Sequence, residues 1–422
     1  MIAHRFPAFQ SADYHRLFLY AFFTTASRWA LMLARAWLVF ELTGSSLAVG
    51  LVTFAGMSQF IIVGPVAGVI ADRFDRRHLA LVAVFLMMAS SGGLAILVIA
   101  DVVAVWHVVL MAVTYGMAMA LAGPAVQALT PNLVPPENLL NAIALAGISQ
   151  HGSRIAGPLL GGIVLATLGA GFVFVASTLI LIFALIQLLQ IRHRDGPIRR
   201  ADEPGLSTRV VLGDIAGGFR HIRRDSRLFA IIGCVGFHCA FTMAYESLLP
   251  RLADSLGGGS NTFSAIVMGV GAGAITGALG VSFIRRQASQ GLGLALTGIG
   301  SGLAMVVLGT ATIPAVAVLG GFLAGSTQAT YMIISHTLVQ QVIPDRLRGR
   351  VMSIFAMLAA GFMAFMNLGF GWLADTVGVR PLMLIPGIAW IVLFALAAVF
   401  LTEIRHVLRV GDFRPRATAV AS

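Results

Sequence analysis

Three titratable side chains stand inside long apolar stretches of this 422-residue chain, and each could carry a proton: Glu246, His151 and His238. An ionisable group within a bilayer is costly, so each of them is a functional candidate by default. Other interpretations stay open. Glu246 could be solvated near the end of its apolar stretch, and either histidine could be a hydrogen-bonded interior residue.

Three arginines also lie within apolar stretches, and polar residues accompany them at helical spacing. Residues three, four or seven positions apart share one face of a helix. Four such faces can be written: Thr24, Thr25, Arg28 and Arg35; Gln150, His151 and Arg154; His238, Thr242, Tyr245 and Glu246; and Gln328, Tyr331 and Ser335. Because three arginines stand against one clear carboxylate, the pattern favours an anionic or electron-rich ligand. Arg35 and Arg154 could instead link neighbouring helices.

The elements that must position these residues are membrane-spanning helices. Only 11% of the residues are charged and 58% are hydrophobic, whereas a soluble domain is about 25% charged. Apolar runs of about 20 residues, long enough to cross a bilayer, recur along the chain. We therefore expect an all-α integral membrane protein with twelve spans, at residues 17–41, 46–71, 79–100, 104–130, 138–167, 171–191, 228–253, 263–284, 291–310, 313–338, 350–375 and 381–402. The net charge of +11 lies mostly in the loops and does not indicate nucleic-acid binding.

The arginines indicate how these spans are oriented. Of 28 arginines, 23 fall in segments on the side of the N-terminus, and two, Arg251 and Arg380, fall in the opposite loops. An excess of basic residues marks the cytoplasmic loops of membrane proteins. We therefore expect both termini in the cytoplasm.

The longest polar stretch divides the spans six and six. We expect an N-terminal six-helix half (1–191), a cytoplasmic linker (192–227) and a C-terminal six-helix half with a short cytoplasmic tail (228–422). Two segments, LTPNLVPPENLLNAIALAG and LVQQVIPDRLRGRVMSIFA, align without gaps at an offset of 209 residues. The alignment and the layout together favour two repeated halves around a central site.

The loop after the second expected span reads GVIADRFDRR and concentrates charge at a membrane boundary. Five of its residues resemble the signature loop of the major facilitator superfamily: Gly68, Asp72, Arg73, Arg76 and Arg77. Asp75 stands where that pattern usually has glycine. The segments WLVFELTGSSLAVGLV, LVPPENLLNAIAL and SRIAGPLLGG make the chain similar to the exporter branch that contains enterobactin and macrolide efflux proteins.

The resemblance implies a fold of two pseudo-symmetric halves in which spans 1, 4, 7 and 10 line a central cavity. It implies a conformational latch at the five loop residues, with Asp72 facing the N-terminus of span 11 and Arg76 and Arg77 meeting anionic lipid headgroups. It also implies a substrate cavity formed by Thr25, Arg28, Arg35, Gln150, Arg154, Thr242, Tyr245, Gln328 and Tyr331. A similar string, GWLADTVGVR at 371–380, falls on the outer side, and we expect it to be a chance match or a remnant of the repeat.

We therefore expect a secondary active transporter that exports a small organic molecule, such as a drug or a siderophore-like metabolite. Protons are the simplest coupling ion, since the chain has no ATP-binding GxxxxGK[ST] loop. The alternatives are an importer of a small metabolite, a lysophospholipid flippase on the same fold, and a membrane sensor or scaffold without transport. We expect no enzyme activity, cofactor, metal or nucleic acid. The expected partners are the substrate, the proton gradient and the lipids of a bacterial inner membrane, around a monomer.

Overall fold

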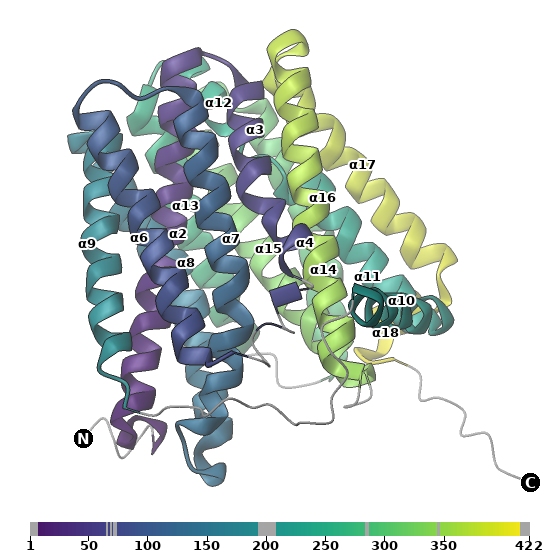
Figure 1. Ribbon diagram of the computed structural model, residues 1–422. Helices are drawn as coiled ribbons and strands as arrows, with labels where there is room; N and C mark the ends of the chain where they lie inside the picture. Colours follow the sequence, from purple (N-terminus) through teal and green to yellow (C-terminus); the bar gives the residue numbers. More distant parts are fainter. Residues whose placement is uncertain are drawn as a thin grey trace, which may run out of the picture.

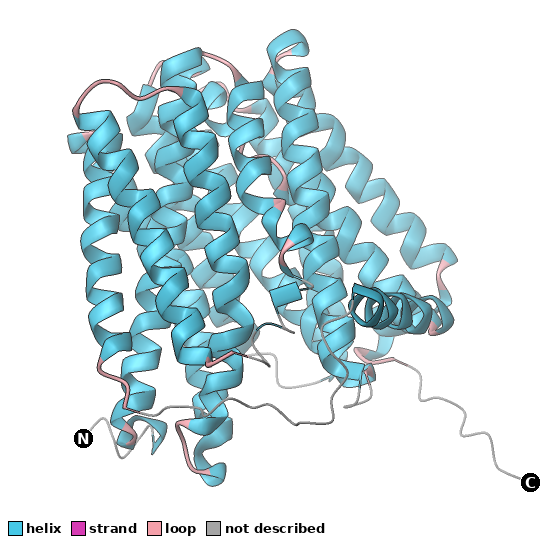
Figure 2. Cartoon of the chain, viewed as in Figure 1, coloured by secondary structure: helices cyan, strands magenta, loops and turns pink. Residues whose placement is uncertain are grey.

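The computed structural model describes residues 7–64, 66–67, 70, 74–192, 208–282, 287–343 and 347–413. Within these ranges every regular element is a helix (Figure 2). Ten of the described helices are long and apolar enough to cross a membrane, and two shorter apolar helices, Ser46–Ile62 and Ala156–Leu168, stand at the second and fifth expected positions. The chain is thus an all-helical, multi-pass membrane protein. The count of twelve spans stays a prediction.

The N-terminal helices have clear start and stop signals in the sequence. They are α2 (Ala12–Thr43), α3 (Ser46–Met57), α4 (Gln59–Ile62), α6 (Arg76–Ile99), α7 (Val105–Leu129), α8 (Leu139–Leu168) and α9 (Ala170–Leu189). Helix α2 ends at Gly44, whose φ of 63° is the left-handed C-cap that glycine adopts without strain. Asp75 begins α6, because its side chain accepts a hydrogen bond of 2.7 Å from the backbone N–H of His78. This cap explains why an acid stands where the resembled loop usually has glycine.

The C-terminal helices follow a helix that lies across one end of the bundle (Figure 1). That helix is α10 (Thr208–Arg224). The others are α11 (Ser226–His238), a π-helix (Cys239–Met243), α12 (Leu249–Ser255), α13 (Gly259–Ser282), α14 (Gln287–Thr310), α15 (Pro314–Val342), α16 (Arg348–Val377), α17 (Val379–Phe400) and α18 (Thr402–Val410).

Glycines let neighbouring helices approach backbone to backbone. A Cβ atom on Gly273 of α13 would lie 1.9 Å from the carbonyl oxygen of Phe322 on α15, and one on Gly325 of α15 would lie 1.9 Å from the carbonyl oxygen of Val270. Small residues are enriched at such contacts in membranes, where close packing replaces the hydrophobic effect between helices. The helices α13 and α15 therefore form a closely packed pair.

The two ends of the bundle differ in charge. We call the end where α2 begins the arginine-rich end, and the opposite one the arginine-poor end (Figure 1). The arginines at the first end whose side chains the structure describes are Arg16, Arg76, Arg77, Arg192, Arg220, Arg223, Arg224, Arg227, Arg405 and Arg409. Those at the second end are Arg251 and Arg380.

Candidate functional site

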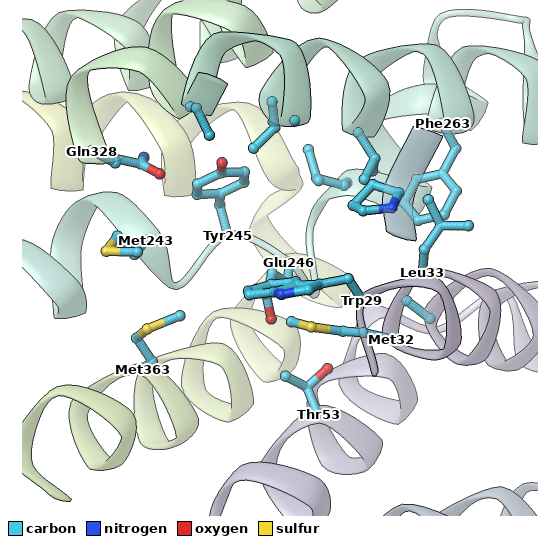
Figure 3. A pocket seen from close by; sticks show the side chains of 18 residues that line it. Trp29, Met32, Leu33, Thr53, Met243, Tyr245, Glu246, Phe263, Gln328 and Met363 are labelled. Atoms are coloured by element: carbon cyan, nitrogen blue, oxygen red, sulfur yellow. The ribbon is translucent and has the colours of Figure 1, made fainter. Parts of the chain in front are cut away.

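A cavity lies between the N-terminal and the C-terminal helices (Figure 3). The N-terminal helices contribute Trp29, Met32, Leu33, Ala36, Thr53 and Pro158 to its wall. The C-terminal side contributes larger and more polar groups, among them Met243, Tyr245, Glu246, Phe263, Gln328 and Met363. Aromatic rings and thioethers thus surround a few polar atoms, which is the usual composition of a site for an organic ligand.

An interruption of the seventh span builds the polar side of this cavity. The span leaves α-helical geometry at the π-helix and resumes as α12 at Leu249. Pro250 stands in the first turn of α12 and favours a break before it, because in a continuous helix its ring would clash with the carbonyl group four residues earlier, here that of Glu246. The interruption turns Tyr245 and Glu246 toward the cavity (Figure 3).

Two amide side chains satisfy backbone groups that the interruption releases. Gln328 Nε2 on α15 donates to the carbonyl oxygen of Thr242 at 2.5 Å. Asn367 Oδ1 on α16 accepts from the backbone N–H of Ser247 at 3.0 Å. Irregular backbone is tolerated at membrane depth only where protein groups or water satisfy it. The broken span is therefore held open by its neighbours.

Glu246 is the only acid or base among the described residues that line the cavity. It lies in the non-helical segment, next to Tyr245, and its carboxylate points into the space between the helices (Figure 3). Such a group can exchange a proton or meet a polar part of a ligand. Its role in proton coupling stays a prediction.

Two of the three arginines of α2, Arg28 and Arg35, lie beside the cavity rather than on its wall. The Arg28 guanidinium sits over the rings of Trp29 and Phe60, at 5.1 and 5.4 Å from their centroids. Arg35 Nε donates to the carbonyl oxygen of Leu31 at 3.2 Å, and its guanidinium lies 5.3 Å from the ring of Tyr115. Aromatic faces stabilise a cation in a desolvated position. Arg28 thus lies behind Trp29, which is part of the cavity wall.

The other residues expected in the cavity have different positions. Tyr245 and Gln328 line it, and buried Thr242 stands behind Gln328. Thr25 and Tyr331 are buried away from the wall, and Gln150 is exposed. The side chains of His151 and Arg154, on α8, lie outside the described part of the structure.

His238 is packed inside the C-terminal helices. Its Nε2 lies 3.0 Å from Ser301 Oγ. Its ring stacks on Tyr331 at 4.1 Å between centroids and meets Trp390 edge-on at 5.2 Å. These contacts match the interpretation of His238 as a hydrogen-bonded interior histidine. A role in proton transfer stays a prediction.

The expected latch is only partly described. Gly68, Asp72 and Arg73 lie outside the described residues. Arg76 Nη1 donates to the carbonyl oxygen of Ala128, at 2.9 Å, and Arg77 Nη2 donates to that of Leu189, at 2.7 Å. The last carbonyl groups of a helix lack helical partners, so these arginines cap the ends of α7 and α9. The sequence indicated lipid headgroups and missed these partners within the protein.

Sequence reasoning also missed the apolar half of the cavity wall. No methionine or phenylalanine was singled out from the sequence, yet Met32, Met243, Met363 and Phe263 line the cavity. Their types carry no signal in a chain this apolar. Only the position of each on its helix, relative to the other half, distinguishes them from lipid-facing residues.

A bundle of apolar helices around a central cavity with an interrupted span defines a membrane transporter of the major facilitator type. Residues 4–415 match the family model described as transmembrane secretion effector, and the chain belongs to that family. It is 27% identical over 346 residues to the enterobactin exporters EntS of Shigella boydii serotype 18 and Escherichia coli O81, covering 82% of this chain and 80% of each relative. The predicted superfamily is confirmed, and the protein is a transporter rather than an enzyme.

Solved structures of transporters share the fold. A POT family transporter in complex with 5-aminolevulinic acid superposes with a TM-score of 0.72 at 14% identity, covering 93% of this chain and 96% of the other. The nucleoside transporter NupG gives 0.70 at 13%, covering 92% and 99%. A D-xylose-proton symporter gives 0.66 at 15%, covering 94% and 98%.

Proposed function

We propose that this protein exports a small organic molecule from the cytoplasm across the inner membrane of a bacterium. The arginine-rich end would face the cytoplasm, as the positive-inside rule requires, with both termini on that side. The monomer would move its cargo by alternating access, with residues 1–191 and 228–422 rocking around the cavity. The linker 192–227 would join the two halves.

The observation that carries the proposal is the cavity between the two sets of helices. Its wall draws on α2, α3 and α8 from one half and on the interrupted span, α13, α15 and α16 from the other. A ligand held there touches both halves. It can therefore bind the two access states with different affinity, which is the only way in which it can shift their equilibrium.

The wall favours a cargo with aromatic or other broad apolar surfaces. Rings of Trp29, Tyr245 and Phe263 and the thioethers offer stacking and soft contacts. Since Glu246 lies on the wall and Arg28 lies behind Trp29, the described wall does not itself select an anion. The curated relatives are named enterobactin exporters, which supports a siderophore-like cargo.

We further propose that the proton gradient drives export, with Glu246 as the coupling group. A carboxylate at the interruption can be reached by cargo and by protons entering the cavity. Binding of the cargo at Glu246 could then release the proton, and binding of the proton could release the cargo. His151 and His238 remain candidates for a second proton site.

The proposal is tested by the accumulation of labelled compounds in cells with and without the protein. The panel holds a catecholate siderophore, a macrolide and a lipophilic cation, each with and without a proton uncoupler. We expect lower accumulation of at least one compound, reversed by the uncoupler. Higher accumulation would instead indicate import. A separate assay follows fluorescent lysophospholipid in the same cells, and a distribution that does not depend on the protein would exclude a flippase.

A pair of tryptophan variants separates the cavity from the lipid-facing surface. Trp29→Ala removes a ring from the wall, and we expect it to reduce export. Trp106→Ala removes a ring that is 63% exposed on α7, and we expect it to leave export unchanged. If Trp29→Ala and Trp106→Ala changed export equally, the transport path would not run through this cavity.

A further inference from the structure

One carboxylate joins the two halves at the arginine-poor end. Asp375, in the last turn of α16, faces the first residues of α3 in the other half. Its Oδ1 accepts from the backbone N–H of Ser46 at 2.8 Å, and its Oδ2 accepts from the N–H of Leu47 at 3.1 Å and from Ser45 Oγ at 2.5 Å. The first N–H groups of a helix lack helical acceptors and carry partial positive charge. Asp375 therefore caps a helix of the opposite half.

Arg251 secures the same carboxylate from a third element. Its Nη1 donates to Asp375 Oδ1 at 2.8 Å and to the carbonyl oxygen of Ala374 at 3.1 Å. Its Nη2 reaches the carbonyl oxygen of Gly44, the C-cap of α2, at 3.4 Å. Arg251 belongs to α12, which directly follows the interruption that carries Glu246. The cavity and this contact are thus joined through one short helix.

The backbones of α3 and α16 touch just below the carboxylate. A Cβ atom on Gly371 would lie 2.4 Å from the carbonyl oxygen of Ser46, and one on Gly50 would lie 2.6 Å from that of Asn367. These glycines bring the halves into contact between Asp375 and the cavity. The two halves are therefore in direct contact at α3 and α16 on the arginine-poor side of the cavity.

The sequence carries a similar string, Gly-x-x-Ala-Asp, at both ends of this helix pair. Residues 371–375 read GWLAD and end the eleventh span, while residues 68–72 read GVIAD and end the second. In the described string, the glycine permits the close approach and the aspartate caps the partner helix one turn later. From the sequence alone, the string at 371–375 is expected to be a chance match or a remnant of the repeat. In the structure, however, its residues Gly371 and Asp375 contact the N-terminus of α3.

We propose that Asp375 and Arg251 are positioning residues that hold the cavity closed on the arginine-poor side, and that their release opens it. The inference rests on the proposed alternating access. A gate must be stable enough to hold the closed state and weak enough to break when the halves separate. Here the carboxylate of Asp375 is shared between the N-terminus of α3 and the guanidinium of Arg251, which also reaches the C-terminus of α2. Both charged side chains remain partly exposed, at 27% for Asp375 and 33% for Arg251, so water can replace the contacts when the halves separate.

We call the contact of Asp375 and Arg251 with the opposite half the latch of the arginine-poor end. Access to a cysteine in the cavity tests this latch without any cargo. Thr53→Cys places a thiol on the cavity wall, about two turns below the latch on α3, and the native Cys234 and Cys239 are buried. A membrane-impermeant maleimide added from outside reports opening on that side. We expect Asp375→Ala and Arg251→Ala each to raise the labelling rate by about tenfold, the factor that corresponds to the loss of one capping interaction.

Conservative and matched variants identify the cause. Asp375→Asn keeps an acceptor but loses the charge, so its labelling rate is expected between wild type and Asp375→Ala. Asp254→Asn and Arg380→Ala change charges at the same end that do not join the halves, since Asp254 is exposed and Arg380 bonds Ala311 of its own half. We expect both to label as wild type does.

The outcomes separate the latch from the transport proposal. Wild-type labelling rates in both Asp375→Ala and Arg251→Ala, with the folded protein verified by its thermal unfolding midpoint, overturn the latch. Faster labelling in these variants, in a protein that exports no compound of the panel, keeps the latch and rejects the export proposal. Faster labelling in the two matched controls as well also overturns the latch, because the effect would then follow any loss of charge at that end.

Discussion

At the scale of single residues, the position of Glu246 depends on a proline four residues later. Pro250 disfavours a continuous helix through Glu246, and the chain leaves the helix here and places Glu246 on the cavity wall (Figure 3). A glutamate near the end of a straight seventh span would lie at the mouth of the bundle instead. The structure thus gives this residue an interior position that its distance along the span did not indicate.

Removing the charge of Glu246 tests its coupling role. We expect Glu246→Gln, which cannot ionise, to reduce gradient-driven export to the level of vesicles without protein. Export of a responsive compound into vesicles with an imposed pH gradient measures this. Glu41→Gln is the matched control, since Glu41 is exposed at the end of α2. Gradient-driven export that persists in Glu246→Gln would assign coupling to another group.

At the scale of elements, helix contacts rather than helix propensities decide how this protein is built. Gly273 weakens α13 as an isolated helix, yet its missing side chain lets α15 approach the backbone of α13. Gly280, further along the same helix, has open space where a Cβ would be. The two positions look alike in sequence and differ only in their neighbours.

This difference gives a matched pair of glycine variants. We expect Gly273→Ala to separate α13 from α15 and to destabilise the protein by about 1–3 kcal/mol, as overpacking does. Gly280→Ala should leave stability unchanged or raise it slightly. Thermal unfolding midpoints in detergent compare the two, and an equal effect would show that the α13–α15 contact is looser than described.

At the scale of the whole molecule, the charge difference between the two ends sets the proposed orientation. Asp101 lies in the turn between α6 and α7 at the arginine-poor end, and Gln190 follows α9 at the arginine-rich end. Both positions are exposed. In a protein inserted in the opposite orientation, Gln190 would be reached from outside the cell and Asp101 from the cytoplasm.

Cysteines at these positions test the orientation. We expect Asp101→Cys to react with an impermeant maleimide in intact cells, and Gln190→Cys to react only after the cells are permeabilised. The buried native cysteines make a low background. The reverse pattern would place both termini outside and contradict export from the cytoplasm as proposed.

The sequence by itself determined the all-helical membrane fold and the transporter class. Apolar runs of spanning length, arginines concentrated in one set of loops, and the loop from Gly68 to Arg77 are local features, and each can be read without knowing any contact. The same local signals placed Tyr245, Glu246 and Gln328 on polar faces.

Only the tertiary structure decided which of these residues share a site. Met363 and Phe263 became part of the cavity wall because of where their helices lie, and Arg35 came to rest over Tyr115 of another helix. Asp375 met Ser46 from the opposite half of the chain. The reason is physical: most side chains of a membrane-spanning helix are apolar, so what distinguishes a lining residue from a lipid-facing one is the neighbour across the helix interface, and that neighbour is far away in sequence.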